Sequence, residues 1–113
     1  MADLVYVNEE EGKKRVMNNA KLYVRLLTKF KTDTNLDGLI ASTEAQDWEK
    51  AQGEAHTIKG IAANLSLTEL FNQALALETQ VKEKSLNPES LENLKTCFGE
   101  TLNEVEKVIA KYA

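Results

Sequence analysis

The stretch AHTIKGIAANLSLTELFNQALALE, residues 55–78, contains two amphipathic segments with only a few residues between them. Apolar residues recur at intervals of three and four on both sides of the break, which is the spacing of a helix packed along one side. Extended outward, the first stripe consists of Trp48, Ala51, Ala55, Ile58, Ala62 and Leu65, and the second of Leu67, Leu70, Ala74, Leu77 and Val81. Because the connection is so short, the pattern predicts an antiparallel helical hairpin.

Capping residues predict where these two helices begin. Asp47 is a favoured N-cap residue for the first helix, which is expected to run to about residue 64. Ser66 and Glu69 have the spacing of a capping box, so the second helix is expected to open at Ser66 and to reach about residue 84.

Helices are predicted on both sides of this hairpin as well. Asn8 and Glu11 have capping-box spacing, and acidic residues precede basic ones over residues 9–15, which favours a short first helix. Two more helices are expected at 20–31 and 35–43, and Asn87 with Pro88 begins a last helix that reaches about residue 112. The predicted inner side chains of the helix at 20–31 are Leu22, Tyr23, Leu26, Leu27 and Phe30, and those of the last helix are Leu91, Leu94, Phe98, Leu102, Val105, Ile109 and Tyr112. The expected fold is all-α, an antiparallel four-helix bundle with short additional N-terminal helices, in a single domain over residues 1–113.

The composition restricts the possible classes of function. The chain is 42% hydrophobic and 28% charged, with five glycines and one proline, which is typical of a helical globular protein. A net charge of −4 without a basic block argues against nucleic-acid and membrane-surface binding. The single cysteine, Cys97, excludes an intrachain disulfide and fits a reducing compartment. No secretory leader or membrane span is evident, so we expect a cytoplasmic protein.

His56, the only histidine, lies about 100° around the helix from Ala55 and therefore outside the apolar stripe. The residues predicted to share its face are Gln52, Gly53, Lys59, Gly60 and Ala63. A glycine inside a helix costs about 1 kcal/mol relative to alanine. Two such glycines within a turn of His56 suggest that a bulky partner needs clearance beside the imidazole.

An exposed imidazole titrates near pH 6.5, so at neutral pH one ring nitrogen is free to act as a nucleophile. Lys59, three residues later, is placed to bring an ammonium beside an anion on the ring, which makes His56 a candidate for phosphorylation. The same spacing also fits a solvated surface histidine, with glycines that permit close helix packing. No second histidine supports a metal site, and we expect Cys97 to be a half-buried small side chain beside Phe98.

Residues 55–78 also closely resemble the signature of histidine-containing phosphotransfer (HPt) domains, a histidine, two residues and Lys-Gly, followed by a second helix ending in Leu-Glu. The residues in register are His56, Lys59, Gly60, Ala63, Asn64, Leu65, Leu70, Leu77 and Glu78. The resemblance extends over essentially the whole chain. Ser66, where the family commonly has glycine, and Ile61, where relatives often have a smaller residue, are mild departures.

The resemblance implies a four-helix bundle that relays phosphate between receiver-domain aspartates of response regulators, or from a histidine kinase, including hybrid kinases, to a receiver. It implies that His56 is the phosphoacceptor, that Lys59 stabilises the phosphoryl charge, that Gly60 provides clearance and that Glu78 hydrogen-bonds the histidine. Gln52, Gly53, Ala63 and Glu78 are expected at the partner-binding face. The receiver would supply the metal and most of the catalysis, so the chain itself is expected to be a carrier without cofactor or metal. A monomer is expected because most of the apolar stripe is used inside one bundle.

Two other functions fit the same sequence. The chain could be a binding-only helical bundle that regulates a kinase or receiver without being phosphorylated, although the presence of His56 with Lys59 argues against that. It could also be the phosphoacceptor domain of a larger chemotaxis-type kinase, whereas Met1 and an end directly after Tyr112 favour a free-standing protein.

Overall fold

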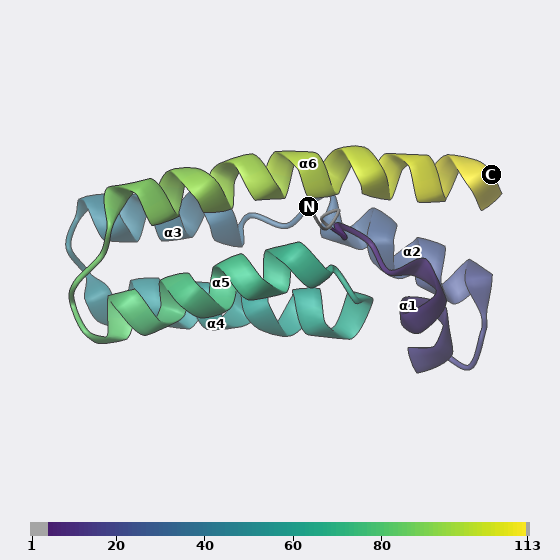
Figure 1. Ribbon diagram of the computed structural model, residues 1–113, viewed down its shortest axis with the longest axis horizontal. Helices are drawn as coiled ribbons and strands as arrows, with labels where there is room; N and C mark the ends of the chain where they lie inside the picture. The colour runs from purple at the N-terminus through teal and green to yellow at the C-terminus, as the bar shows by residue number, and fades with distance from the viewer. Residues whose placement is uncertain (1–4, 113) are drawn as a thin grey trace.

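A computed structural model describes residues 5–112, which form six α-helices and no β-strand. The helices are α1 (Glu9–Arg15), α2 (Ala20–Phe30), α3 (Asn35–Glu44), α4 (Trp48–Leu65), α5 (Thr68–Lys82) and α6 (Pro88–Tyr112). In Figure 1, α6 runs the full length of the molecule, with the α4–α5 hairpin along one half and α1 and α2 at the other. The predicted all-helical bundle is therefore confirmed, with short helices ahead of the hairpin.

Three of the four predicted N-caps, Asn8, Asp47 and Asn87, are confirmed. The Asn8 and Asp47 side chains accept hydrogen bonds from the backbone amides of Glu11 and Lys50, and Asn19, which was not predicted as a cap, accepts from that of Leu22. The Asn87 side chain likewise accepts from the amide of Glu89, directly after Pro88. Each cap satisfies one of the amides that the first turn of a helix leaves without a partner.

The turn between α4 and α5 differs from the prediction. Ser66 adopts the left-handed conformation (φ 57°, ψ 43°) that ends α4, and α5 begins only at Thr68, without a side-chain cap. The Leu67 amide donates to the carbonyl of Ala62 and the Ser66 amide to that of Ala63, a helix-ending pattern that usually has glycine at the left-handed position. The capping box predicted for Ser66 and Glu69 is therefore wrong, because the reversal carries Leu67 into the core before the next helix starts.

The buried residues of α4 and α5 follow the predicted stripes closely. In α4 they are Ala51, Ala55, Ile58, Ala62 and Leu65, and in α5 Leu70, Ala74, Leu77 and Val81. These residues belong to one hydrophobic cluster with Tyr23, Leu27 and Phe30 of α2, while Trp48, Leu22 and Leu26 are only half-buried. The hairpin therefore buries the side opposite to His56.

The inner side of α6 agrees with the prediction at Leu94, Phe98 and Val105, which are buried, and differs from it at other positions. Cys97, Thr101 and Val108 are buried, whereas Leu91, Leu102 and Ile109 are half-buried and Tyr112 is exposed. A helix of 25 residues that packs on α5 in one half and on α2 in the other cannot present a single straight stripe. Thr101 can be buried because its hydroxyl donates to the carbonyl of Cys97, 2.7 Å away.

Tyr23 ties α2 to the end of α4. Its side chain is fully buried, and its hydroxyl donates to the carbonyl of Leu65 at 2.8 Å. Tyr23→Phe leaves that carbonyl, at the end of a helix, without this donor. The free energy of unfolding is expected to fall by about 1–3 kcal/mol. Urea denaturation of both proteins measures the change, and equal stability would show that the hydrogen bond contributes nothing.

Candidate functional site

His56 lies in the middle of α4 with its side chain 67% exposed. Its neighbours in the stripe, Ala55 and Ile58, are buried, so the imidazole leaves the opposite side of the helix. The Nδ1 atom lies 3.0 Å from Oε2 of Glu78 on α5. The hairpin thus brings together two side chains that are 22 positions apart in the sequence.

Glu78 is shared between His56 and Lys59. Its other oxygen, Oε1, lies 2.7 Å from the Lys59 ammonium, and its side chain is only 14% exposed. Burial alone would raise the pKa of Glu78, but the hydrogen bonds and charges of Lys59 and His56 outweigh burial and leave the pKa lowered. The carboxyl group is therefore an anion at neutral pH.

The charge of Glu78 determines the tautomer of the neutral imidazole. A carboxylate can only accept hydrogen bonds, so Nδ1 carries the proton that it donates to Glu78. Nε2 then keeps its lone pair, and it has no hydrogen-bond partner among residues 5–112. The arrangement holds the ring through Nδ1 and leaves Nε2 as an exposed nucleophilic nitrogen.

The two glycines near His56 leave open space. A Cβ atom built at Gly53 or Gly60 meets no neighbouring atom of residues 5–112 within 4 Å. Close packing of α4 against another helix therefore does not explain these glycines, and that interpretation of the sequence is excluded. Gln52 and Ala63, on the same face, are half-buried.

The comparison with known families supports the same part of the chain. A family model described as Hpt domain matches residues 25–108, which contain His56, Lys59 and Glu78. The chain belongs to the Hpt domain family. Hpt domains carry phosphoryl groups between kinases and receiver domains in two-component signalling and are not catalytic enzymes themselves. No curated protein and no solved structure matches this Hpt domain.

Replacing the open glycines is expected to stabilise this Hpt domain. Gly53→Ala and Gly60→Ala each add helix propensity without a clash, so each should raise the free energy of unfolding by about 0.5–1 kcal/mol. Gly12→Ala is the matched control, because its Cβ would lie 2.5 Å from the ring of Tyr23 and should destabilise. Urea denaturation distinguishes them, and a loss of stability at Gly53 or Gly60 would contradict the open-space interpretation.

A groove of about 700 Å³ beside the His56 helix was not predicted from the sequence. Its apolar lining comes from Val16, Leu26, Phe30, Ile61 and Leu65, with Arg15, Lys29, Asp33 and Asn64 also on its walls. These residues come from α2 and the connection after it, from α4 and from the end of α1, and no single helix pattern could have indicated that they meet. Among the lining residues, only Ile61 departs from the family pattern, as a residue larger than relatives often have there.

The sequence expectations for a metal site, for Cys97 and for a membrane span also concern the described part of this Hpt domain. Within residues 5–112, no three His, Cys, Asp or Glu side chains are grouped to hold a metal ion. Cys97 is buried rather than half-buried as expected, and burial raises the pKa of its thiol to about 11, so the thiolate is scarce at neutral pH. None of the described helices combines the length and apolar character needed to cross a bilayer.

Proposed function

We propose that this protein is a phosphorelay intermediate that carries a phosphoryl group on Nε2 of His56 and exchanges it with receiver-domain aspartates of response regulators or of a hybrid histidine kinase. One observation carries the proposal. The exposed imidazole donates from Nδ1 to the anionic Glu78 and leaves Nε2 free, within the segment that matches the Hpt family.

In the transfer, the Nε2 lone pair attacks the phosphorus of the receiver's aspartyl phosphate. The bond between phosphorus and the acyl oxygen breaks, and the aspartate leaves as a free carboxylate. The proton on Nδ1 stays on the ring, and the positive charge that develops there faces the carboxylate of Glu78 at 3.0 Å. Return of the phosphoryl group to a second aspartate reverses these steps.

Lys59 supplies the positive charge for the phosphoryl group in this proposal. Its ammonium lies 2.7 Å from Oε1 of Glu78, the carboxylate whose other oxygen faces His56 Nδ1. A phosphoryl group on His56 adds about −2 charge, which a lysine within reach can balance. Lys59 and Glu78 are therefore assigned supporting roles around the acceptor.

The partner would cover the open face of α4. Gly60 and Gly53 provide clearance, and Gln52, Ala63 and Glu78 are assigned to the contact surface around His56. We further propose that the chain works as a single cytoplasmic domain and a monomer, as an antiparallel four-helix bundle preceded by short helices. The partner, a receiver or its kinase, brings the catalytic groups.

The test is phosphate uptake from a phosphorylated receiver. The protein is incubated with a panel of phosphorylated receiver domains, and the phosphate is located by mass spectrometry. Acid-labile, base-stable phosphate on His56 is expected. Receivers that bind the protein but leave no phosphate on it would instead support the binding-only bundle.

A further inference from the structure

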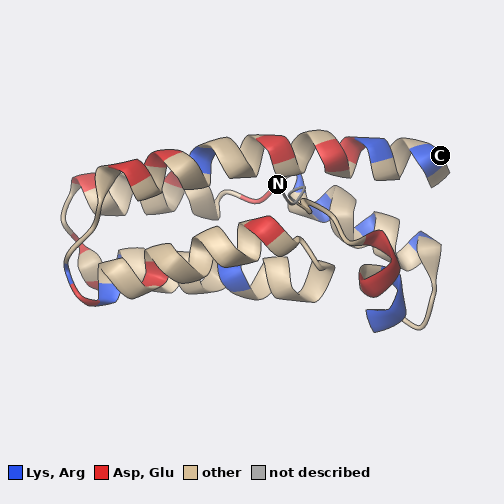
Figure 2. Ribbon diagram, viewed as in Figure 1, with Lys and Arg blue, Asp and Glu red and all other residues tan. Residues whose placement is uncertain are grey.

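Helix α1 is joined to the bundle mainly by polar contacts. The structure describes every residue of α1, and the buried one among them is Gly12, which packs against the ring of Tyr23. The first turn of α1 is acidic and its last turn basic, as Figure 2 shows. Hydrophobic burial of α1 side chains therefore contributes little to its attachment.

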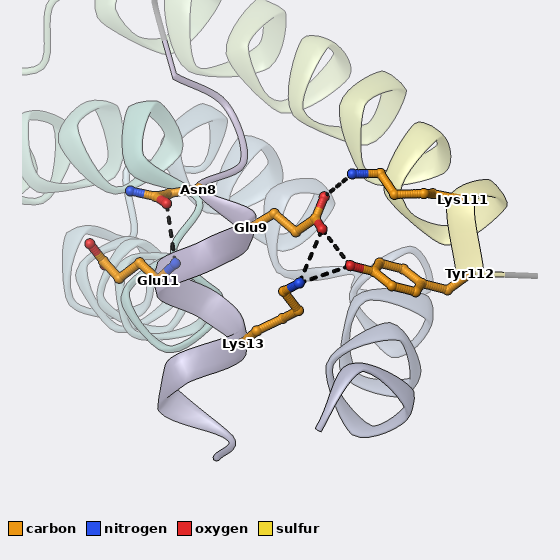
Figure 3. A network of polar contacts seen from close by, with 6 residues as sticks. All are labelled: Asn8, Glu9, Glu11, Lys13, Lys111 and Tyr112. Carbon is orange, nitrogen blue, oxygen red and sulfur yellow. Dashed lines mark hydrogen bonds and ion pairs between the residues drawn. The ribbon is translucent and has the colours of Figure 1, made fainter. Parts of the chain in front are cut away.

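Glu9 holds one end of α1 against the end of α6 (Figure 3). Its Oε1 lies 2.7 Å from the Lys111 ammonium, and its Oε2 accepts from the Tyr112 hydroxyl at 2.5 Å and lies 3.5 Å from the Lys13 ammonium. Lys13 also donates to the Tyr112 hydroxyl at 3.0 Å. All four residues lie outside the segment 25–108 that matches the Hpt family, so this clamp is an addition to the family's core.

The other side of α1 contacts the turn that ends the His56 helix. The Asn8 amide donates to the carbonyl of Ser66 at 2.9 Å, and Arg15 Nε donates to the Ser66 hydroxyl at 3.1 Å. That hydroxyl donates in turn to Glu11 at 2.9 Å. Helix α1 thus bridges the end of α6 and the end of α4.

The connection that follows α1 is strained, and the segment before it is anchored. Met17 and Asn18 both have positive φ, 58° and 61°, a conformation that costs energy for residues other than glycine. Ahead of α1, Tyr6 and Val7 pack against the core, and the carbonyl of Val5 accepts from the amide of Glu69. Helix α1 therefore lies between a segment held to the core ahead of it and α2, whose Tyr23, Leu27 and Phe30 are buried, after it.

We propose that α1 is a lid that opens and closes over the end of the bundle while the rest stays folded, and that Glu9 is its clamp. Arg15 and Val16 belong to the lining of the groove beside α4, together with Ile61 and Asn64. The groove is therefore complete only when the lid is closed. We expect a bound receiver to favour the closed lid, and this expectation rests on the function proposed above. The opening of the lid does not depend on that function.

Hydrogen exchange measured by mass spectrometry tests the opening. Glu9→Gln removes the negative charge of the clamp, and Glu10→Gln is the matched control, because Glu10 is exposed and makes no hydrogen bond or ion pair with residues 5–112. The weakened clamp is expected to give roughly fivefold to thirtyfold faster exchange in residues 8–18. Exchange in α4, α5 and α6 should stay unchanged, and Tyr112→Phe should act in the same direction as Glu9→Gln.

Two outcomes overturn the lid. Exchange in residues 8–18 that is equal in Glu9→Gln and Glu10→Gln shows that Glu9 is no clamp. Acceleration throughout the bundle shows that α1 does not open by itself.

Raising the salt concentration should reproduce the effect of Glu9→Gln in the wild type, since ion pairs at the surface are screened.

A second measurement tests the coupling to the partner. A receiver domain that exchanges phosphate with the protein is added at about 100 times its Kd, which should slow exchange in residues 8–18 up to about a hundredfold if it binds only the closed form. Unchanged exchange with the receiver bound rejects the coupling. If no receiver binds at all, the proposed function fails, while the comparison of Glu9→Gln with Glu10→Gln still decides whether the lid exists.

Discussion

His56→Gln is expected to abolish phosphate uptake while the protein stays folded. Glutamine has no ring nitrogen that can take the phosphoryl group, and no second histidine is present to replace it. The side chain of His56 is 67% exposed and outside the core, so the free energy of unfolding should change by no more than about 0.5 kcal/mol. Radiolabelled phosphate transfer and urea denaturation measure the two quantities.

Glu78→Gln is the control for His56→Gln. It keeps the imidazole but replaces the anion that Nδ1 faces at 3.0 Å, so uptake should continue at a reduced rate. A neutral amide can also accept from Nδ1, but it stabilises the developing positive charge less. Phosphate uptake by His56→Gln at the wild-type rate would show that another residue is the phosphoacceptor. Uptake by Glu78→Gln at the wild-type rate would show that Glu78 has no role in the transfer.

Gly60→Phe is expected to slow phosphotransfer by roughly a hundredfold, since a displacement of about 1 Å between reacting groups can cost that much. No atom of residues 5–112 lies within 4 Å of a Cβ built at this position, so the new ring would project into the space that the receiver must occupy. Stability should not fall with the rate, because phenylalanine has a higher helix propensity than glycine. Rapid-quench measurement of transfer from a phosphorylated receiver gives the rate.

Gly99→Phe is the matched control for Gly60→Phe. Gly99 also lies inside a helix, α6, is exposed, and has no described atom within 4 Å of a built Cβ. The same substitution there should leave the transfer rate unchanged. Equal slowing by both variants would mean that a bulky aromatic side chain acts through something other than clearance at His56.

The clearance argument also explains why two glycines persist in α4 at a cost in stability. The alanine variants at Gly53 and Gly60 are expected to be more stable, and only a partner outside the chain gives the open space a purpose. Gly12, by contrast, is required by the ring of Tyr23 within the chain. Glycine is therefore needed for two different physical reasons in this protein, clearance for a partner in α4 and close approach of a ring in α1.

The sequence by itself determined that helices form, three of their N-caps and the exposure of His56. These properties depend on neighbours within one or two turns, which the 3.6-residue period and the capping residues encode directly. Asn8, Asp47 and Asn87 could be identified as caps for that reason, and so could the buried stripe through Ala55, Ile58 and Ala62. The resemblance to HPt domains added the expectation that Glu78 contacts the histidine.

Only the tertiary structure decided which atoms meet across helices. The register of the hairpin depends on the left-handed turn at Ser66, where the sequence pattern had predicted a capping box. That register brings Glu78 into contact with both His56 and Lys59. The clamp between Glu9 and Tyr112 joins positions 103 apart, and no local pattern can encode such a contact. Periodicity predicts on which face of its helix a side chain lies, whereas the packing of the whole chain determines which side chains it contacts.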